Sequence, residues 1–225
     1  MGRGSLVTPE QRSAFRARIE PMALAMSRAG LTPNMLTLIG FGIAAVGGLL
    51  AAVEWWFLAG IVATAGAAFD LFDGAVARAT GQVTRVGAFM DSTFDRWGEG
   101  VVYVGIVVGA TNAGFDLGAW IAAAALVSAF MVSYVRSKSE SLGFSSGTGM
   151  AAIGLAPREV RTVILGLGLV GAGLLGGVSP DLVDAGSLVL AASLALIALL
   201  ATITVVQRIR HVISQPTDHE GSPSA

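Results

Sequence analysis

Residues 69–96 read FDLFDGAVARATGQVTRVGAFMDSTFDR and hold four aspartates, in a chain that is 54% hydrophobic and only 13% charged. The aspartates form two pairs, Asp70 with Asp73 and Asp91 with Asp95. Spacings of three and four residues put both members of a pair on one face of a helix. Two helices can therefore aim four carboxylates at one point, and the rest of the chain is interpreted around this stretch.

Four carboxylates in or near a bilayer need a positive partner, because even one buried charge costs about 3 kcal/mol on insertion scales. The chain has no cysteine and no histidine near the aspartates, so the available ligands are hard oxygens. Such ligands favour Mg²⁺, Mn²⁺ or Ca²⁺ over zinc or copper. Divalent ions beside four carboxylates suit transfer at a phosphate, since metals bridge phosphate oxygens and offset developing negative charge. The alternative is a set of solvated acids at helix ends.

The composition indicates one membrane domain. The 225 residues have a mean hydropathy of +0.73 and include 30 glycines, which is too apolar for an ordinary soluble domain. The formal net charge of −1 gives no indication of nucleic acid, and we expect no nucleic-acid partner. The absence of cysteine excludes disulfides and thiol chemistry. No apolar stretch followed by a cleavage site begins the chain, so we expect no removable signal peptide.

We expect an all-α integral membrane protein with six transmembrane helices, because roughly 20 apolar residues cross a hydrocarbon core. The expected spans are 35–53, 56–79, 86–111, 117–137, 160–178 and 182–206. The expected organisation is a tail and interfacial helix in 1–30, the six-helix domain in 31–213 and a disordered tail in 214–225.

An amphipathic helix is predicted before the first span. Phe15, Ile19, Met22 and Met26 recur at helical spacing among arginines, after a capping box that starts at Thr8. This pattern is typical of a helix that lies in the membrane interface. A helix packed on a soluble partner is the alternative.

The positive charges predict the topology. All fourteen Lys and Arg residues lie before the first span, around the second-to-third and fourth-to-fifth connections, or after the sixth span. By the positive-inside rule, both termini and the aspartates are cytoplasmic, at the cell membrane.

The aspartates belong to a motif with eight fixed positions, Asp70-x-x-Asp73-Gly74-x-x-Ala77-Arg78, eight further residues, and Gly87-x-x-x-Asp91-x-x-x-Asp95. The motif resembles the complete signature of the CDP-alcohol phosphotransferases. The resemblance implies an integral membrane enzyme, a homodimer, that transfers a phosphatidyl-type group from a CDP-linked donor to an alcohol and releases CMP.

The same resemblance implies roles for the aspartates. Asp70, Asp73 and Asp91 are expected to be the main ligands of two Mg²⁺ or Mn²⁺ ions. Asp95 is the expected general base for the acceptor hydroxyl, and this role overlaps with that of a fourth metal ligand.

Donor-binding residues are also expected from the motif and from the start of the first span. The candidates for binding the CDP group are Gly74, Ala77, Arg78, Gly87, Asn34 and Thr37. Each has another interpretation: glycines allow close packing of membrane helices, Arg78 is a topology signal, and Asn34 and Thr37 suit helix capping.

Four basic residues on the side of the aspartates are candidates for binding a phosphorylated acceptor: Arg136, Lys138, Arg158 and Arg161. Arginine can hold a phosphate through two parallel hydrogen bonds. Topology signals or contacts with anionic lipids are the alternative. The surrounding segments GAFMDSTFDR, SYVRSKSE and APREVR are most similar to the inositol-phosphate branch of the family.

The expected reaction is therefore transfer from CDP-diacylglycerol to an inositol phosphate. Glycerol phosphate is the second acceptor, although the branch that uses it has Pro and Lys where this chain has Ser92 and Arg96. A divalent-cation transporter is an alternative of another class, but it leaves the glycines and Arg78 unexplained and expects ligands near mid-membrane. A catalytically idle lipid-binding relative is a third, against which the intact aspartate set argues.

Overall fold

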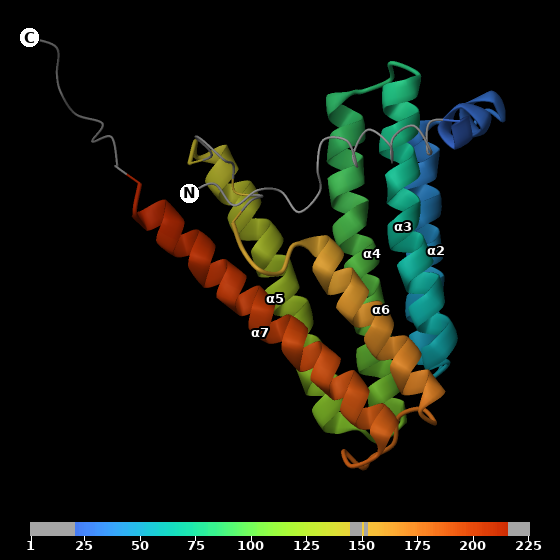
Figure 1. Cartoon of the computed structure of the whole chain (residues 1–225), viewed down its shortest axis with the longest axis vertical. Helices are drawn as coiled ribbons and strands as arrows, with labels where there is room; N and C mark the ends of the chain where they lie inside the picture. Colours follow the sequence, from blue (N-terminus) through green and yellow to red (C-terminus); the bar gives the residue numbers. More distant parts are fainter. Residues whose placement is uncertain (1–20, 145–149, 151–152, 216–225) are drawn as a thin grey trace, which may run out of the picture.

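The computed structural model describes residues 21–144, 150 and 153–215, and these residues form helices and connections with no strand among them. The helices are α2 (Pro33–Ala52), α3 (Trp56–Ala79), α4 (Arg85–Asn112), α5 (Asp116–Ser141), α6 (Arg158–Leu174) and α7 (Ala185–Ile213). Figure 1 shows them as one bundle. The expected all-α class is confirmed, and each expected span overlaps one of these helices, with bounds that differ by up to seven residues at the end of α7.

Four of these helices, α2, α3, α5 and α7, are long and apolar enough to cross a membrane. The other two depart from a simple apolar span for different reasons. Near its start α4 carries Asp91, Asp95, Arg96 and Glu99, and α6 has only 17 residues. The structure therefore supports a membrane protein with several apolar helices, and the count of six spans stays a prediction.

The predicted N-terminal interfacial helix is described only from residue 21. Residues 21–28 are helical, and Ala23 is fully buried against Leu36 of α2 and Val76 of α3. On another side Met22 is half exposed. This segment therefore covers part of the bundle, while the predicted helix before it and the tail after residue 215 lie outside the described residues.

Threonine caps fix where two of the helices begin. The Thr32 hydroxyl accepts a hydrogen bond from the Met35 N–H at the start of α2, where Pro33 is the first helical residue. The Thr84 hydroxyl accepts from the Gly87 N–H at 2.9 Å and starts α4. The connection between α3 and α4 is therefore only five residues long, 80–84, so the two aspartate pairs lie at the same end of the bundle.

Glycines allow α2 to lie very close to α3 and α4. A Cβ atom on Gly105 of α4 would overlap the carbonyl of Gly48 of α2, and one on Gly47 would lie 2.8 Å from the Ala63 nitrogen of α3. Close helix approach of this kind is typical of membrane bundles. It fixes the three helices that carry the aspartates and Thr37 relative to one another.

The remaining helices complete the bundle around a core that includes Tyr103, Ile106, Leu169, Leu190 and Leu194. Helix α6 packs against α3 and α7, and α5 packs against α7 and α4. In Figure 1, α2, α3 and α4 stand side by side, whereas α5 and α7 are inclined to them. At the end that holds the α3–α4 connection, α5 and α7 thus diverge from α4.

Candidate active site

The four aspartates lie on two neighbouring helices, at the end of the bundle that holds the α3–α4 connection. Asp70 and Asp73 lie in the last turns of α3, and Asp91 and Asp95 lie near the start of α4. The carboxylate of Asp70 lies within electrostatic range of those of Asp91 and Asp95. The helical spacing seen in the sequence therefore brings both pairs to one region.

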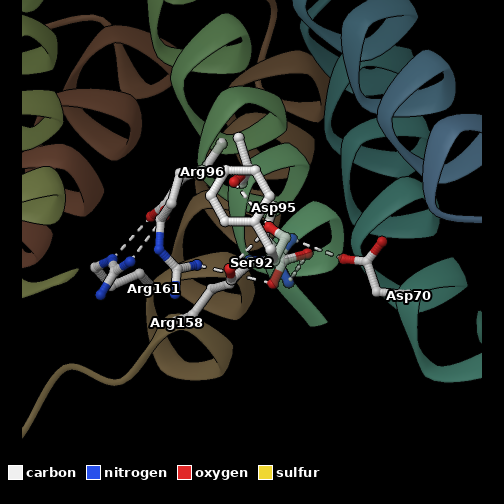
Figure 2. A network of polar contacts seen from close by, with 9 residues as sticks. Asp70, Ser92, Asp95, Arg96, Arg158 and Arg161 are labelled. Carbon is white, nitrogen blue, oxygen red and sulfur yellow. Dashed lines mark hydrogen bonds and ion pairs between the residues drawn. The ribbon is translucent and has the colours of Figure 1, made fainter. Parts of the chain in front are cut away.

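Arg158 lies between Asp70 and Asp95 (Figure 2). Its Nη2 is 2.7 Å from Oδ2 of Asp70, and its Nη1 is 2.8 Å from Oδ1 of Asp95. Arginine stays protonated in proteins, because its guanidinium is a very weak acid. Arg158 is therefore a permanent cation between the two aspartate-bearing helices.

Asp73 is held by α2 rather than by an arginine. The Thr37 hydroxyl donates to its Oδ2 at 2.7 Å, and the Gly74 N–H donates to its Oδ1. The residue is only 5% exposed. Thr37, which the sequence suggested as a donor contact, is thus a direct partner of an aspartate.

Gly40 of α2 makes room for Asp70. A Cβ atom at position 40 would lie 2.8 Å from Oδ1 of Asp70, closer than a normal contact. Sequence reasoning did not single out this glycine, because its role depends on how α2 packs on α3.

The six predicted donor residues line one cavity together with Asp73 and Asp91. Its volume is about 620 Å³, and the predicted residues are Asn34, Thr37, Gly74, Ala77, Arg78 and Gly87. A pocket of this size falls in the usual range for small-molecule sites. A Cβ atom added to Gly74 would lie 3.1 Å from the Arg78 side chain, and one added to Gly87 would lie 3.1 Å from the Thr84 hydroxyl. Larger residues at these two positions would therefore crowd the side chains that line the cavity.

A second cavity of about 840 Å³ lies between α4, α5, the start of α6 and α7. Three of the four predicted acceptor residues line it, Arg136, Arg158 and Arg161, whereas Lys138 is exposed on α5 and does not. Asp91 and Asp95 also line it, and Asp91 therefore borders both cavities.

Arg208 is a lining residue that the sequence analysis treated only as a topology signal. Its guanidinium donates to the carbonyls of Ile153, at 2.9 Å, and Val132, at 2.5 Å. Two arginines, Arg208 and Arg210, near the end of an apolar helix were the only signal for it. Arg96 also lines this cavity and lies 3.8 Å from Asp95.

The predicted acceptor residues differ in what they contact. Arg136 pairs with Glu140 on the exposed face of α5 at 3.0 Å. Arg161 is 1% exposed and forms two hydrogen bonds of 2.8 Å to Glu99, which the sequence analysis had not identified. Arg158 is the member of the set that contacts the aspartates.

The connection before α6 is held by α7. The Thr204 hydroxyl accepts hydrogen bonds from the N–H groups of Leu155 and Ala156 at 2.9 and 3.0 Å. Between them and Ile153 lies Gly154, whose φ of +123° is a conformation that side-chain-bearing residues rarely adopt. Thr204 and Arg208, one turn apart on α7, thus fix the backbone that leads to Arg158.

The chemistry of the aspartates fits a hard divalent cation, because their ligand atoms are all carboxylate oxygens. In the described ranges 21–144, 150 and 153–215, no three Asp, Glu or His side chains converge as a metal-binding group. Asp70 and Asp95 instead contact Arg158, and Asp73 contacts Thr37. The Arg158 guanidinium between Asp70 and Asp95 shows that these two carboxylates stabilise a positive charge placed between them.

Sequence comparison places the chain among known proteins. Residues 30–203 match the family described as CDP-alcohol phosphatidyltransferase. The chain is 38% identical to archaetidylinositol phosphate synthase from Pyrococcus horikoshii over 159 residues, which cover 68% of this chain and 77% of that protein. It is 36% identical to phosphatidylinositol phosphate synthase from Mycolicibacterium smegmatis over 168 residues, 72% of this chain and 71% of that protein.

The fold is similar to that of phosphatidylinositol phosphate synthase from Mycobacterium tuberculosis. The structure of that protein with CDP-DAG bound has a TM-score of 0.77 and 27% sequence identity, over 92% of this chain and 98% of the other. Its structure with manganese and citrate has the same score and identity, over 91% and 93%.

Proposed function

Because the chain belongs to the CDP-alcohol phosphatidyltransferase family, we propose that it transfers a phosphatidyl group from CDP-diacylglycerol to an inositol phosphate and releases CMP. Relatives named as synthases of inositol-phosphate lipids support this acceptor. The observation that carries the proposal is that Asp91 borders two cavities, one with the small residues of the motif in its wall and one lined by arginines. Glycerol phosphate is the second candidate acceptor.

The donor is proposed to bind in the cavity lined by the motif residues. Gly74, Ala77 and Gly87 present no large side chain there, and Arg78 supplies a positive charge for the diphosphate. Asn34 and Thr37 close the α2 side of the same cavity. The M. tuberculosis relative with CDP-DAG bound supports this donor class.

The acceptor phosphate is proposed to bind in the second cavity, at Arg136 and Arg158, with Lys138 at its margin. Arginine side chains bind phosphate well because two N–H groups can engage two oxygens. Arg161 lines the same cavity, but three of its N–H groups are used by Glu99 and by the Ala156 carbonyl. Its proposed contribution to acceptor binding is therefore indirect.

The proposed reaction is a displacement at phosphorus. Asp95 takes the proton from the acceptor hydroxyl as its oxygen bonds to the phosphorus next to the lipid. The bond from that phosphorus to the oxygen of CMP breaks, and CMP leaves with the electron pair. Asp95 borders the arginine-lined cavity, where this hydroxyl would arrive.

Asp70, Asp73 and Asp91, with Asp95, are the proposed ligands of two divalent ions, Mg²⁺ or Mn²⁺. Bound divalent ions supply positive charge that polarises the phosphate and stabilises the leaving group. The manganese complex of the M. tuberculosis relative supports the use of a divalent metal.

The proposed membrane arrangement has all six helices crossing, with α4 and α6 packed against the four apolar ones. The site and both termini face the cytoplasm of the cell membrane, as the positive charges predict. The N-terminal helix lies in the interface, and the enzyme is a homodimer. Accessibility labelling of single introduced cysteines in each connection tests the orientation.

The proposal is tested by CMP release. The purified protein in lipid nanodiscs receives CDP-diacylglycerol and Mg²⁺ or Mn²⁺, with inositol phosphate, glycerol phosphate, inositol or serine added one at a time. Release that depends on inositol phosphate and stops with a chelator is expected. Release with glycerol phosphate alone would change the acceptor, and no release with any acceptor would overturn the proposed reaction.

A further inference from the structure

Arg158 is held by two carboxylates that are also proposed metal ligands. Its Nη2 lies 2.7 Å from Oδ2 of Asp70, and its Nη1 lies 2.8 Å from Oδ1 of Asp95 (Figure 2). The three side chains are largely buried, with exposed fractions of 21%, 17% and 14%. The guanidinium therefore engages the same carboxylates that divalent ions at this site require.

No other hydrogen bond or ion pair holds this guanidinium in the described part of the chain. The Nε of Arg158 is buried there without a hydrogen-bond partner. Two neighbouring arginines are held differently, since Arg161 pairs with Glu99 and Arg208 donates to two backbone carbonyls. Those partners are not proposed metal ligands. The place of the Arg158 side chain therefore depends on whether the aspartates hold a metal ion.

A second environment is open to the same guanidinium. Arg158 lines a small cavity of about 40 Å³ together with Asp70 and Asp95. It also lines the arginine-lined cavity, where the acceptor phosphate is proposed to bind. A phosphate oxygen accepts the same charge-assisted hydrogen bonds as a carboxylate oxygen. The phosphate of the acceptor can therefore replace the two carboxylates as the partner of Arg158.

The charges of the site favour such an exchange of partners. The four aspartates carry four negative charges, and two divalent ions supply four positive charges. A guanidinium that stays between Asp70 and Asp95 adds a further positive charge beside the ions. Like charges repel strongly at short range in a buried site. The negative charge of an acceptor phosphate balances the guanidinium once Arg158 turns toward it.

We propose that Arg158 couples metal binding to acceptor binding. It neutralises Asp70 and Asp95 before a divalent ion binds, and it moves to the acceptor phosphate when the carboxylates bind the ion. This inference rests on the proposed function, which supplies both the metal and the phosphorylated acceptor. Because a coupling free energy is reciprocal, phosphate strengthens metal binding by the same factor as metal strengthens phosphate binding.

The first test measures Mn²⁺ binding without turnover, from the EPR signal of free Mn²⁺ over the protein in nanodiscs of zwitterionic lipid. Arg158→Gln removes the competing cation, so the Mn²⁺ dissociation constant without acceptor is expected to fall about tenfold or more. An Arg158→Gln protein that binds Mn²⁺ no more tightly than the unmodified protein overturns the proposal.

Arg136→Gln is the matched control for that measurement. Arg136 lines the same cavity, but it pairs with Glu140 on the exposed face of α5 and does not contact the aspartates. Because its charge is exposed and screened, the Mn²⁺ dissociation constant without acceptor is expected to stay within about twofold of the unmodified value. A fall as large as that in Arg158→Gln would show a general field effect and overturn the specific role of Arg158.

The second test measures the coupling at saturating phosphate. Inorganic phosphate and inositol phosphate are each expected to lower the Mn²⁺ dissociation constant of the unmodified protein about fivefold or more, whereas inositol leaves it unchanged. Arg136→Gln also loses a proposed phosphate contact and is expected to keep the full effect. In Arg158→Gln the effect is expected to be much smaller. Equal coupling with and without Arg158 overturns the exchange of partners.

Thermal unfolding keeps the proposal testable if Arg158→Gln is unstable. Without divalent ions this variant leaves two buried carboxylates without their cation and should melt below the unmodified protein. Added Mn²⁺ is expected to raise its melting temperature by more than that of the unmodified protein, because tighter binding stabilises more. Arg158→Lys keeps the charge but cannot bridge both carboxylates in the same way, and the same larger rise is expected. An equal or smaller rise in both variants overturns the proposal.

The proposed function and this inference fail separately. If the unmodified enzyme releases no CMP with any acceptor, the proposed function fails, and the Mn²⁺ measurements still decide whether Arg158 competes with the ion. If CMP release depends on inositol phosphate but Mn²⁺ binds equally to the unmodified protein and to Arg158→Gln, the inference alone is overturned.

Discussion

The Thr37 hydroxyl of α2 donates a hydrogen bond to the Asp73 carboxylate of α3, with 2.7 Å between the oxygens. Replacing Thr37 with Val keeps the shape and leaves that buried carboxylate oxygen without this donor, which costs about 1–3 kcal/mol. We expect a lower melting temperature and at least about tenfold lower kcat/KM for the donor. Thr37→Ser keeps the hydroxyl and should retain most of the activity. Unchanged kcat/KM in Thr37→Val would show that this bond does not orient Asp73.

Gly40→Ala should displace Asp70. The added methyl group would lie 2.8 Å from Oδ1 of Asp70, so the carboxylate must move while the helix gains a better helix former. We expect normal folding with a loss of kcat of about tenfold or more. Gly42→Ala is the matched control, because a Cβ at position 42 of the same helix has no neighbour within 4 Å. Equal activity of the two variants would contradict the prediction.

Asp95→Asn should abolish CMP release and spare much of the donor binding. The amide has nearly the same shape as the carboxylate but cannot accept the proton of the acceptor hydroxyl. Steady-state CMP release and equilibrium binding of CDP-diacylglycerol are the two measurements. Retained turnover would remove Asp95 from the role of base.

Gly154→Ala should loosen the connection that leads to Arg158. The residue has a φ of +123°, and a Cβ there would collide with the Thr204 side chain. Because Thr204 then loses its contacts with the Leu155 and Ala156 N–H groups, we expect a higher KM for the acceptor. Gly143→Ala, also at positive φ but with no neighbour within 4 Å, controls for backbone strain alone. A similar acceptor KM in both variants would show that the contacts of Thr204 with this connection do not affect acceptor binding.

The helices and the location of both aspartate pairs at one end of the bundle could be predicted because both depend on local patterns. Apolar runs mark the helices, and helical spacing puts Asp70 with Asp73 and Asp91 with Asp95. The donor residues likewise gather at one cavity because most of them flank these aspartates in the chain. The fold class followed from these patterns, whereas the family followed from the resemblance of the eight-position motif to a known signature.

Contacts between distant segments could not be predicted. Glu99 and Arg161 are 62 residues apart, and Thr37 and Asp73 are 36 apart. These pairings depend on how each helix is rotated, which is set by close backbone contacts such as that of Gly48 with Gly105. A sequence read by periodicity shows which residues share a face, but not which face meets which neighbour. For the same reason Arg161 was predicted as an acceptor contact and not as the partner of Glu99.

Asp91 borders both cavities, and this has a kinetic consequence. If the lipid nucleotide and the sugar phosphate enter by separate openings, neither has to leave before the other binds, and the enzyme works through a ternary complex. One direct displacement inverts the configuration at phosphorus, whereas a covalent enzyme intermediate would retain it through two inversions. The configuration of the product formed from a chiral phosphorothioate donor would therefore distinguish a direct transfer in the ternary complex from transfer through a covalent enzyme intermediate.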